Sequence, residues 1–234
     1  MIYKTISPTE SQVGKYIDIN GDGIPEGVIF ADLAVGGKGR YGNKHGSCMY
    51  EIPVRTKEFK DYVVIGKHED NINGKQDVLT PILDGENRFY IMALRDFNNG
   101  MYGMFSWYEQ AYHKIEDYNT LTKSDFGTGK QNTLTMIEKW NNEIYGAKNP
   151  RDIWNTIQNK INEGWFVPST AEWATFAYRL NISSKNYEKK NMSNNYWTSH
   201  LCDRAKAYFI TFYDECFSNA SVISDIHIRL AKAI

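Results

Sequence analysis

The stretch GWFVPSTAEWATFAYRLNI, residues 164–182, decides the fold expected for this chain. Its apolar run WFV predicts a short strand directly after a glycine. Ser169, followed three residues later by Glu172, predicts a capping box, in which each side chain accepts a backbone N–H from the other residue. The apolar positions that follow have helical spacing, and they predict an inner helix face of Trp173, Phe176 and Leu180. The stretch therefore predicts a strand that leads into an amphipathic helix.

Strand-like segments lie on both sides of this unit. Residues 13–94 have the pattern of short strands and turns, and VGKYIDI and GVIFADLAV flank the turn NGDGIPE at 20–26, which predicts a hairpin. Residues 105–182 are mainly helical, and residues 194–234 return to strands with the runs NYWTS, AYFITF and IHIRLAKAI. The order strands, helices, strands predicts the α+β class. The chain has 234 residues and no low-complexity linker or internal repeat, so we expect a single domain, 1–234.

Two helices are expected between residue 105 and the strand WFV. The first has an apolar face of Leu134, Ile137, Trp140 and Ile144, and Gly146 stands where a glycine would end it. Asn149 then fits the N-cap of the second helix, with Pro150 in its first turn. The second helix stops at Gly164, and its buried side is expected to be Ile153, Ile157 and Ile161.

Charge and hydropathy limit the partners and the location of the chain. The net charge of -1 gives no electrostatic reason to expect a nucleic acid or an anionic membrane as a partner. No apolar run approaches the ~20 residues that a membrane span needs. The initial segment MIYKTISPTESQVGKY has no apolar core of the secretory type. We therefore expect that the chain does not insert into a membrane and that it is made in the cytoplasm. Display on a phage particle or cell surface would then use a route that needs no signal.

Candidate metal ligands are few. Asp18, Asn20 and Asp22 imitate the first positions of an EF-hand calcium loop, but Ile29 occupies the twelfth position, where a bidentate Glu is required. A polar hairpin turn is the alternative for this segment. The five histidines show no metal-binding spacing, and the spacings of Cys48, Cys202 and Cys216 match neither a zinc ribbon nor a CxxC redox unit. Calcium at the hairpin turn is the one metal candidate, and no cofactor is expected.

One glycine pattern imitates a nucleotide-binding motif. Gly37, Gly39 and Gly42 satisfy GxGxxG, but the segment that follows has strand character, so no helix N-terminus is available for a pyrophosphate. We expect a flexible loop at these residues. GTGKQ at 127–131 lacks the spacing of a P-loop.

The C-terminal third of the chain carries a resemblance to a known family. GWFVPSTAEW, then NYWTS, AYFITF and IRLAKAI, resemble a C-type-lectin-like fold of the formylglycine-generating-enzyme type. Within it, the chain is most similar to the variable proteins of diversity-generating retroelements from gut bacteria and their phages. The likeness extends to residues 13–37, 87–94, 135–142 and 151–169. It implies short twisted antiparallel sheets with packed helices, and a ligand-binding scaffold in which codons of the last segment, 194–234, are rewritten.

The resemblance divides the last segment into fixed and variable positions. In such systems the adenines of Asn-type codons are randomised, which limits the residue types that can appear. By the family pattern, the fixed residues are Trp197, Ala207, Tyr208, Ile210, Phe212, Phe217, Val222, Ile228, Arg229 and Leu230. The ligand-binding, variable residues are Cys202, Asp203, Arg204, Phe209, Thr211, Tyr213, Asp214, Cys216, Ser218, Asn219, Ala220, Ser221, Ile223, Ser224, Asp225, Ile226 and His227. His200 and Leu201 also have reachable types but can be scaffold variants, whereas Lys206 and Glu215 do not fit the set.

Strand alternation adds an expectation about exposure. In AYFITF, Tyr208, Ile210 and Phe212 would be buried, and Phe209 and Thr211 would be displayed on the other face. Displayed aromatic side chains suit a binding surface, because they supply large contact area at modest entropic cost. The alternative is that three of the apolar residues pack under a neighbouring loop, namely Phe209, Ile223 and Ile226.

Three functions follow from the resemblance and the residues. The first is a non-catalytic protein that recognises a protein or glycan ligand on another cell or virus through a diversified C-terminal surface. The second is a fixed, lectin-like phage-tail or adhesin module that binds glycan, with Trp154, Trp165 and Trp173 either as a stacking platform or as core. The third is a formylglycine-generating oxidase, which the residues favour least, because Cys202 and Cys216 are fourteen positions apart and the surrounding signature is missing.

Overall fold

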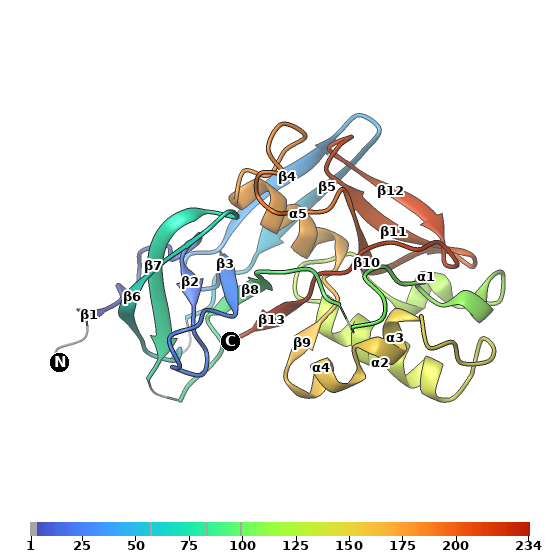
Figure 1. Ribbon diagram of the computed structural model, residues 1–234, viewed down its shortest axis with the longest axis horizontal. Helices are drawn as coiled ribbons and strands as arrows, with labels where there is room; N and C mark the ends of the chain where they lie inside the picture. The colour runs from blue at the N-terminus through green and yellow to red at the C-terminus, as the bar shows by residue number, and fades with distance from the viewer. Residues whose placement is uncertain (1–3, 57, 83, 99) are drawn as a thin grey trace.

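The computed structural model describes residues 4–56, 58–82, 84–98 and 100–234, and it has the α+β class expected from the sequence (Figure 1). A mixed eight-stranded sheet has the order β1-β6-β7-β2-β3-β8-β13-β9, in which β2 and β7 are parallel and the other neighbours antiparallel. Its strands are β1 (Lys4–Thr5), β2 (Tyr16–Ile17), β3 (Gly27–Asp32), β6 (Tyr62–Asp70), β7 (Gly74–Pro81), β8 (Phe89–Ala93), β9 (Trp165–Phe166) and β13 (Ala231–Ala233). The expected hairpin around residues 20–26 is confirmed, because β2 pairs with β3.

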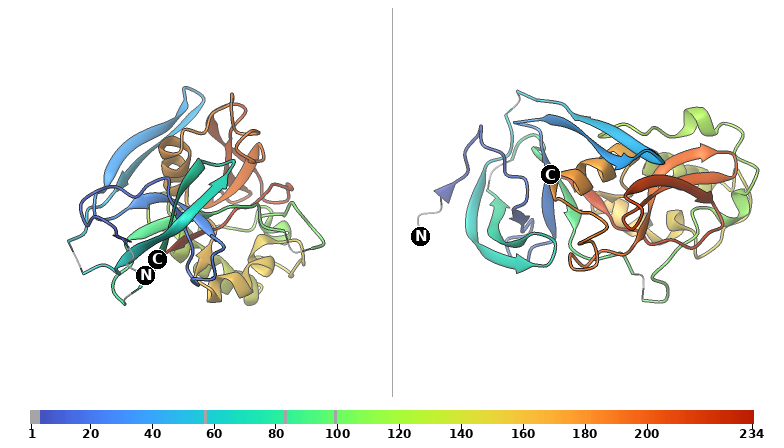
Figure 2. Two further views of the ribbon diagram at one scale, coloured as in Figure 1. Left: turned by 60° about the vertical axis from the view of Figure 1, so that its left-hand side comes forward. Right: turned by 90° about the horizontal axis from the view of Figure 1, so that it is seen from above.

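Two smaller sheets and a group of helices complete the fold. One sheet is the hairpin β4 (Gly37–Asn43) and β5 (Gly46–Ile52), and the other is β10 (Asn195–Asp203), β11 (Lys206–Thr211) and β12 (Cys216–Ser221). The helices are η1 (Glu109–Ala111), α1 (Tyr118–Leu121), α2 (Gly129–Asn141), α3 (Ile153–Thr156), α4 (Gln158–Asn162) and α5 (Thr170–Arg179). Figure 2 shows, from above, that the β4–β5 hairpin extends along the molecule until its turn lies beside β12.

Helix α5 is the centre of the fold. Its capping box is present as predicted: Ser169 Oγ accepts the Glu172 N–H, and the Glu172 carboxylate accepts the Ser169 N–H at 2.7 Å. Trp173, Phe176 and Leu180 are buried, as expected for the inner face. The helix contacts β3, β4, β5, β10 and β11, so it joins all three sheets.

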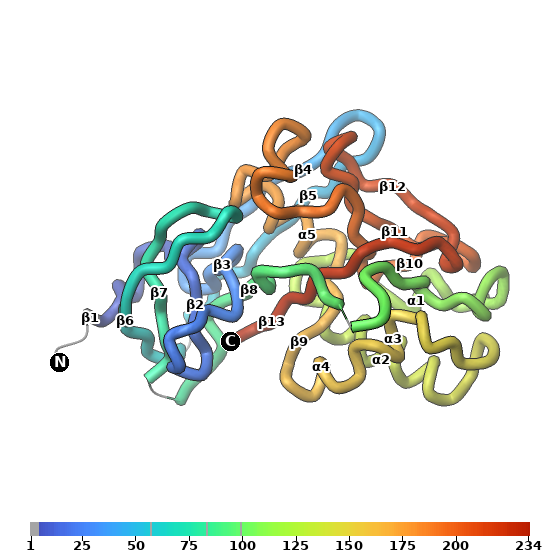
Figure 3. Tube along the Cα trace, viewed as in Figure 1, coloured from blue at the N-terminus to red at the C-terminus, as the bar shows by residue number. Residues whose placement is uncertain are grey.

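Two large hydrophobic clusters fill the interior. The first surrounds α5, which we call the α5 core, and includes Trp173, Phe176, Tyr196, Ile210 and Phe212. The second lies among the helices, which we call the helical core, and includes Phe105, Trp107, Trp140, Trp154 and Trp197. The sheet β10-β11-β12 lies between them, because adjacent residues Tyr196 and Trp197 of β10 enter different clusters. Figure 3 follows the last forty residues from this sheet to β13 in the large sheet.

The inner face predicted for helix α2 is wrong in part. Ile137 and Trp140 are buried, but Leu134 is 41% exposed, and Ile144 lies beyond the end of the helix and is 55% exposed. The buried side of α2 is formed by Gly129, Asn132, Thr133, Met136, Ile137 and Trp140. Asn132 and Thr133 on this buried side are polar. A prediction made from the spacing of apolar residues alone therefore chose a neighbouring face of the helix as the buried one.

The helix expected to begin at Asn149 begins later. Asn149 Oδ1 accepts the Arg151 N–H at 2.9 Å, which forms a turn, and α3 starts at Ile153 with Asp152 at its N-cap position. The single expected helix is divided into α3 and α4 before Gly164. Its apolar side is confirmed for Ile153, Ile157 and Ile161, of which the first two are fully buried and the third is half-buried.

The glycine-rich segment 37–42 is a strand and not a flexible loop. It forms β4, which pairs with β5 along its whole length. A Cβ on Gly39 would lie 2.6 Å from the hydroxyl oxygen of Tyr50, and a Cβ on Gly37 would overlap the Arg179 guanidinium. The glycines therefore allow β4 to lie closely under the side chains of Tyr50, on the neighbouring strand, and Arg179, on α5.

Candidate ligand-binding site

The predicted fixed and variable residues of the last segment differ in burial. Nine of the ten predicted fixed residues are buried, and Tyr208 is the half-buried exception. Among the predicted variable residues, the exposed ones are Arg204, Tyr213, Asp214, Asn219, Ile223 and Asp225. The half-buried ones are Cys202, Asp203, Phe209, Ser218, Ala220, Ser221, Ser224 and His227. The remaining three are buried.

These three residues correct the expectation that the variable positions are displayed. Thr211 lies opposite Cys216 in the β11–β12 ladder, and the two are 3% and 6% exposed. Ile226 is 7% exposed, because it forms an isolated bridge with Phe105 and packs in the helical core. The alternative that Ile226 packs under a neighbouring segment is confirmed, whereas Ile223 is 48% exposed.

Strand β11 is covered on both faces, so the display predicted for Phe209 and Thr211 is wrong. Phe209 is half-buried against the helical core, with its ring 6.3 Å from that of Trp197. On the other face, Ile210 belongs to the α5 core. Further along that face, Tyr208 lines a pocket.

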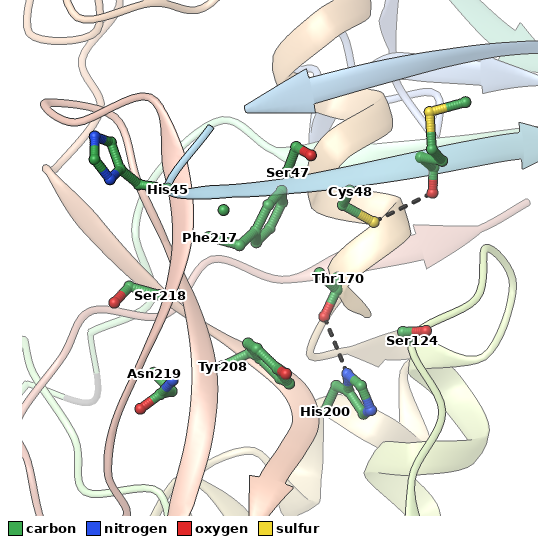
Figure 4. Close-up of a pocket in the computed structure, with 12 residues that line it drawn as sticks. His45, Ser47, Cys48, Ser124, Thr170, His200, Tyr208, Phe217, Ser218 and Asn219 are labelled. Carbon is green, nitrogen blue, oxygen red and sulfur yellow. Dashed lines mark hydrogen bonds between the residues drawn. The ribbon is translucent and has the colours of Figure 1, made fainter. Parts of the chain in front are cut away.

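This pocket, which we call the hairpin pocket, has a volume of about 580 Å³ and lies between β5 and the β10-β11-β12 sheet (Figure 4). A Cβ on Gly46 would overlap the carbonyl of Phe217, so the turn of the hairpin is seated directly on β12. The pocket is lined by His45, Gly46, Ser47, Cys48, Met49, Ser124, Thr170, His200, Tyr208, Phe217, Ser218 and Asn219. Only Ser218 and Asn219 were predicted as site residues. His200, Tyr208 and Phe217 lie in the same C-terminal segment, where the last two were expected to be fixed and His200 was left open. The remaining seven come from distant segments and carry no motif that the sequence could have revealed.

The rings of His200 and Tyr208 stack inside the pocket. Their centroids are 5.1 Å apart with an interplanar angle of 20°, and His200 Nδ1 is 3.4 Å from Thr170 Oγ1. Burial lowers the pKa of His200, although the charge of Asp125 raises it in part, so the imidazole is neutral at pH 7. Two causes raise the pKa of Tyr208 above its usual value: the larger is a hydrogen bond with Cys202, and the smaller is burial. The hydroxyl of Tyr208 is therefore also neutral at pH 7.

The lining combines polar groups with a few apolar side chains. Among the described residues that line the pocket, none is Asp, Glu, Lys or Arg. Burial raises the pKa of the Cys48 thiol to about 11, and its sulfur lies 3.2 Å from the Met49 carbonyl oxygen. A thiol with this pKa is protonated at neutral pH and is a poor nucleophile.

Cys202 and Cys216 lie at opposite ends of their sheet. Cys216 is opposite Thr211, whereas Cys202 is beside the pairs Leu201–Ala207 and Asp203–Lys206. Five residues of β11 separate these ends, or about 17 Å along an extended strand. The two sulfurs are therefore too far apart for a disulfide or a cooperating thiol pair, and all three cysteines are free.

In the β2–β3 turn, the carboxylate oxygens of the calcium candidate Asp18 already accept hydrogen bonds from the backbone of the same turn. Asp18 is fully buried, and its carboxylate accepts the backbone N–H groups of Gly21 and Gly23, both at 2.6 Å. The neighbouring Glu26 carboxylate accepts the Ile19 N–H at 2.6 Å. Within the described parts of the chain, no group of three or more His, Cys, Asp or Glu side chains is placed to hold a metal ion. The structure therefore favours the polar hairpin turn.

The tryptophans that could form a sugar-stacking platform are mainly core residues. Trp154 and Trp173 are fully buried in separate clusters. Trp165 is half-buried, and the ammonium group of Lys232 lies 5.7 Å from its ring centroid. The platform interpretation is therefore wrong for Trp154 and Trp173.

Comparison with known proteins assigns no family. No protein-family model matches the chain, and no curated protein matches it. A solved structure of a fimbrial protein from Bacteroides ovatus ATCC 8483 is similar, with 13% sequence identity and a TM-score of 0.43 over 63% of this chain and 36% of that one. The matched part is thus about a third of the fimbrial protein. Over residues 4–56, 58–82, 84–98 and 100–234, no helix has the length and apolar character needed to cross a membrane.

Proposed function

We propose that this protein is a non-catalytic binding module that recognises a ligand on another cell or virus. Its recognition surface consists of the hairpin pocket and the exposed side chains of residues 202–227. The observation that carries the proposal is the division of the C-terminal segment: nine of ten framework residues are buried, while the residues between them are mostly exposed or half-buried.

This division suits a binding surface for an energetic reason. Substitutions at exposed positions usually change the free energy of unfolding by less than about 0.5 kcal/mol, whereas large-to-small changes in a core cost about 2–5 kcal/mol. Side chains such as Arg204, Tyr213 and Ile223 can therefore change the partner without changing the fold. The position of the cysteines supports a binding role over an oxidase, because Cys202 and Cys216 cannot act together.

The hairpin pocket favours a fixed module of the lectin or adhesin type. Ten of its twelve lining residues lie outside the predicted variable set, and seven of these ten lie outside the last segment, 194–234, altogether. A fixed pocket with a changeable border is therefore the arrangement that we propose. The C-type-lectin-like subtype remains part of this proposal.

Diversification by a retroelement is a second candidate, which the exposure of the variable positions supports. Its test is the neighbouring DNA. A reverse-transcriptase gene, together with a near-repeat of the last coding segment that differs mainly at adenines, would support it. A genomic neighbourhood without either would leave the fixed adhesin as the function.

The binding proposal is tested with the labelled full chain on an array of purified glycans and on a panel of whole bacterial cells. The triple variant Arg204→Ala, Tyr213→Ala, Ile223→Ala should lose or redirect binding by at least ~10-fold while its Tm stays close to that of the unmodified chain. The matched control replaces three other exposed residues, Ile24, Ile82 and Leu134, with Ser. The proposal fails if both variants bind as the unmodified chain does, or if the unmodified chain binds nothing on either panel.

A further inference from the structure

We infer that the hairpin pocket binds an uncharged, polyhydroxylated ligand, a saccharide ring, without a metal ion. This inference rests on the proposed binding function and names the ligand class of its fixed part. It is carried by three properties of the pocket: neutral lining, hydrogen-bonding groups without protein partners, and a flat pair of stacked rings.

The first property concerns charge. An ion that enters a partly enclosed site without an opposite charge loses hydration that nothing replaces. The hairpin pocket offers no carboxylate, ammonium or guanidinium group among its described lining residues. Of its two histidines, His200 is neutral at pH 7, and His45 is exposed at the turn of the hairpin, on the border of the pocket. An anion such as a phosphate or a carboxylate sugar would therefore bind poorly, all the more because the negative charge of Asp125 acts on His200 and Cys48 in the lining. A neutral ligand loses nothing by the absence of a charged partner.

The second property concerns hydrogen bonds. The side chains of Ser47, Ser218 and Asn219 make no hydrogen bond to any described residue, although all three line the pocket. They come from β5 and β12, and Ser124 and Thr170 add hydroxyl groups from the opposite side. Hydroxyl groups donate and accept at once, and an amide does both through separate atoms. Such a lining matches a ligand that carries several hydroxyl groups in different directions.

The third property is the stacked pair. Figure 4 shows Tyr208 and His200 side by side across the pocket from the β5 strand, with Thr170 between them and Cys48. In a stacked pair each ring covers one face of the other, so the face of Tyr208 turned away from His200 is the flat apolar surface, and a pyranose ring presents a flat face of C–H groups that can pack on it. The volume of about 580 Å³ is within the range of small-molecule sites, ~300–1,000 Å³.

The test measures binding of the full chain to an array of defined neutral and acidic glycans in a buffer that contains EDTA. We expect neutral glycans to bind, and we expect Tyr208→Ala to weaken that binding at least ~10-fold while Tyr208→Phe, which keeps the ring, retains most of it. Tyr112→Ala is the matched control, because exposed Tyr112 also contacts a histidine ring, that of His113, but lies outside the pocket. Thermal unfolding of each variant separates loss of the site from loss of the fold.

The outcomes separate this inference from the proposed function. Binding only of acidic glycans, binding abolished by EDTA, or an equal loss in Tyr208→Ala and Tyr112→Ala would overturn the saccharide site. If neutral glycans fail but the triple variant of the exposed surface still alters binding to cells, the binding function stands and the ligand class is wrong. If neither array nor cells are bound, both proposals fail.

Discussion

The carboxyl group of Glu172 gives the protein a pH-dependent stability that can be measured. Glu172 is fully buried, and its Oε1 and Oε2 accept the backbone N–H groups of Gly127 and Ser169 at 3.1 and 2.7 Å. It thus connects the segment before α2 with the start of α5. Burial raises its pKa from 4.5 to about 7, and the backbone N–H donors offset only part of that shift.

The sign of the effect follows from the raised pKa. A carboxyl group that binds its proton more tightly in the folded state stabilises the fold fully below the pKa of the unfolded chain, near 4.5. That contribution is lost as the pH rises through about 7. The interval of about 2.5 pH units corresponds to roughly 3 kcal/mol at 1.36 kcal/mol per unit.

The variant Glu172→Gln isolates this contribution because glutamine has nearly the same shape and does not titrate. Its amide nitrogen would face at least one of the backbone N–H donors, which adds a cost that does not depend on pH. We expect the free energy of unfolding of the unmodified chain, minus that of the variant, to fall by roughly 3 kcal/mol between about pH 5 and about pH 8.5. Urea unfolding at a series of pH values measures both quantities.

A constant difference across that pH range would refute the reasoning. It would mean that Glu172 is ionised throughout, and that the backbone N–H donors outweigh burial. Direct titration of the side-chain carboxyl carbon by NMR gives an independent answer: a midpoint near 4 contradicts the prediction, and a midpoint near 7 supports it.

Two further predictions concern other buried polar contacts. Ser169→Ala removes the hydroxyl acceptor of the capping box and the hydrogen bond from Ser169 Oγ to the Asp125 carbonyl oxygen. It should lower the free energy of unfolding, measured in urea, by about 1 kcal/mol. A change below about 0.3 kcal/mol would show that the cap does not stabilise the fold. In the unmodified chain, the Arg88 guanidinium donates two hydrogen bonds to the Asp32 carboxylate, at 2.9 and 3.0 Å, and the two side chains are 4% and 1% exposed. Arg88→Met leaves this buried carboxylate without its charge partner. It should cost about 3–5 kcal/mol, and the double variant Arg88→Met, Asp32→Asn should cost less than the single one; a double-mutant cycle with additive costs would contradict this.

Several parts of the fold could be predicted because they depend on neighbouring residues. The capping box of Ser169 and Glu172 and the β2–β3 hairpin are formed by groups within a few positions of each other. The strands at NYWTS and AYFITF follow from local composition, and the order of elements gives the α+β class. Local hydrogen bonds and backbone preferences determine these features, and the sequence contains all the information they need.

The site was less predictable because burial depends on partners far along the chain. Alternation in β11 separated Tyr208 from Phe209, but it could not tell which of the two faces would be covered. Trp197 and the rest of the helical core cover Phe209, while the β4–β5 hairpin, more than 150 residues earlier, forms a pocket beside Tyr208.

The sequence by itself thus determined most of the local elements and the class of the fold, and the family resemblance selected most of the residues that are buried in the last segment. Only the tertiary structure decided that both faces of β11 are packed and that Gly46 seats the hairpin on β12 beside an uncharged pocket. The physical reason is the range of the forces involved: hydrogen bonds within a turn or a cap involve residues a few positions apart. Burial of a side chain is decided by whichever surface the whole chain brings against it.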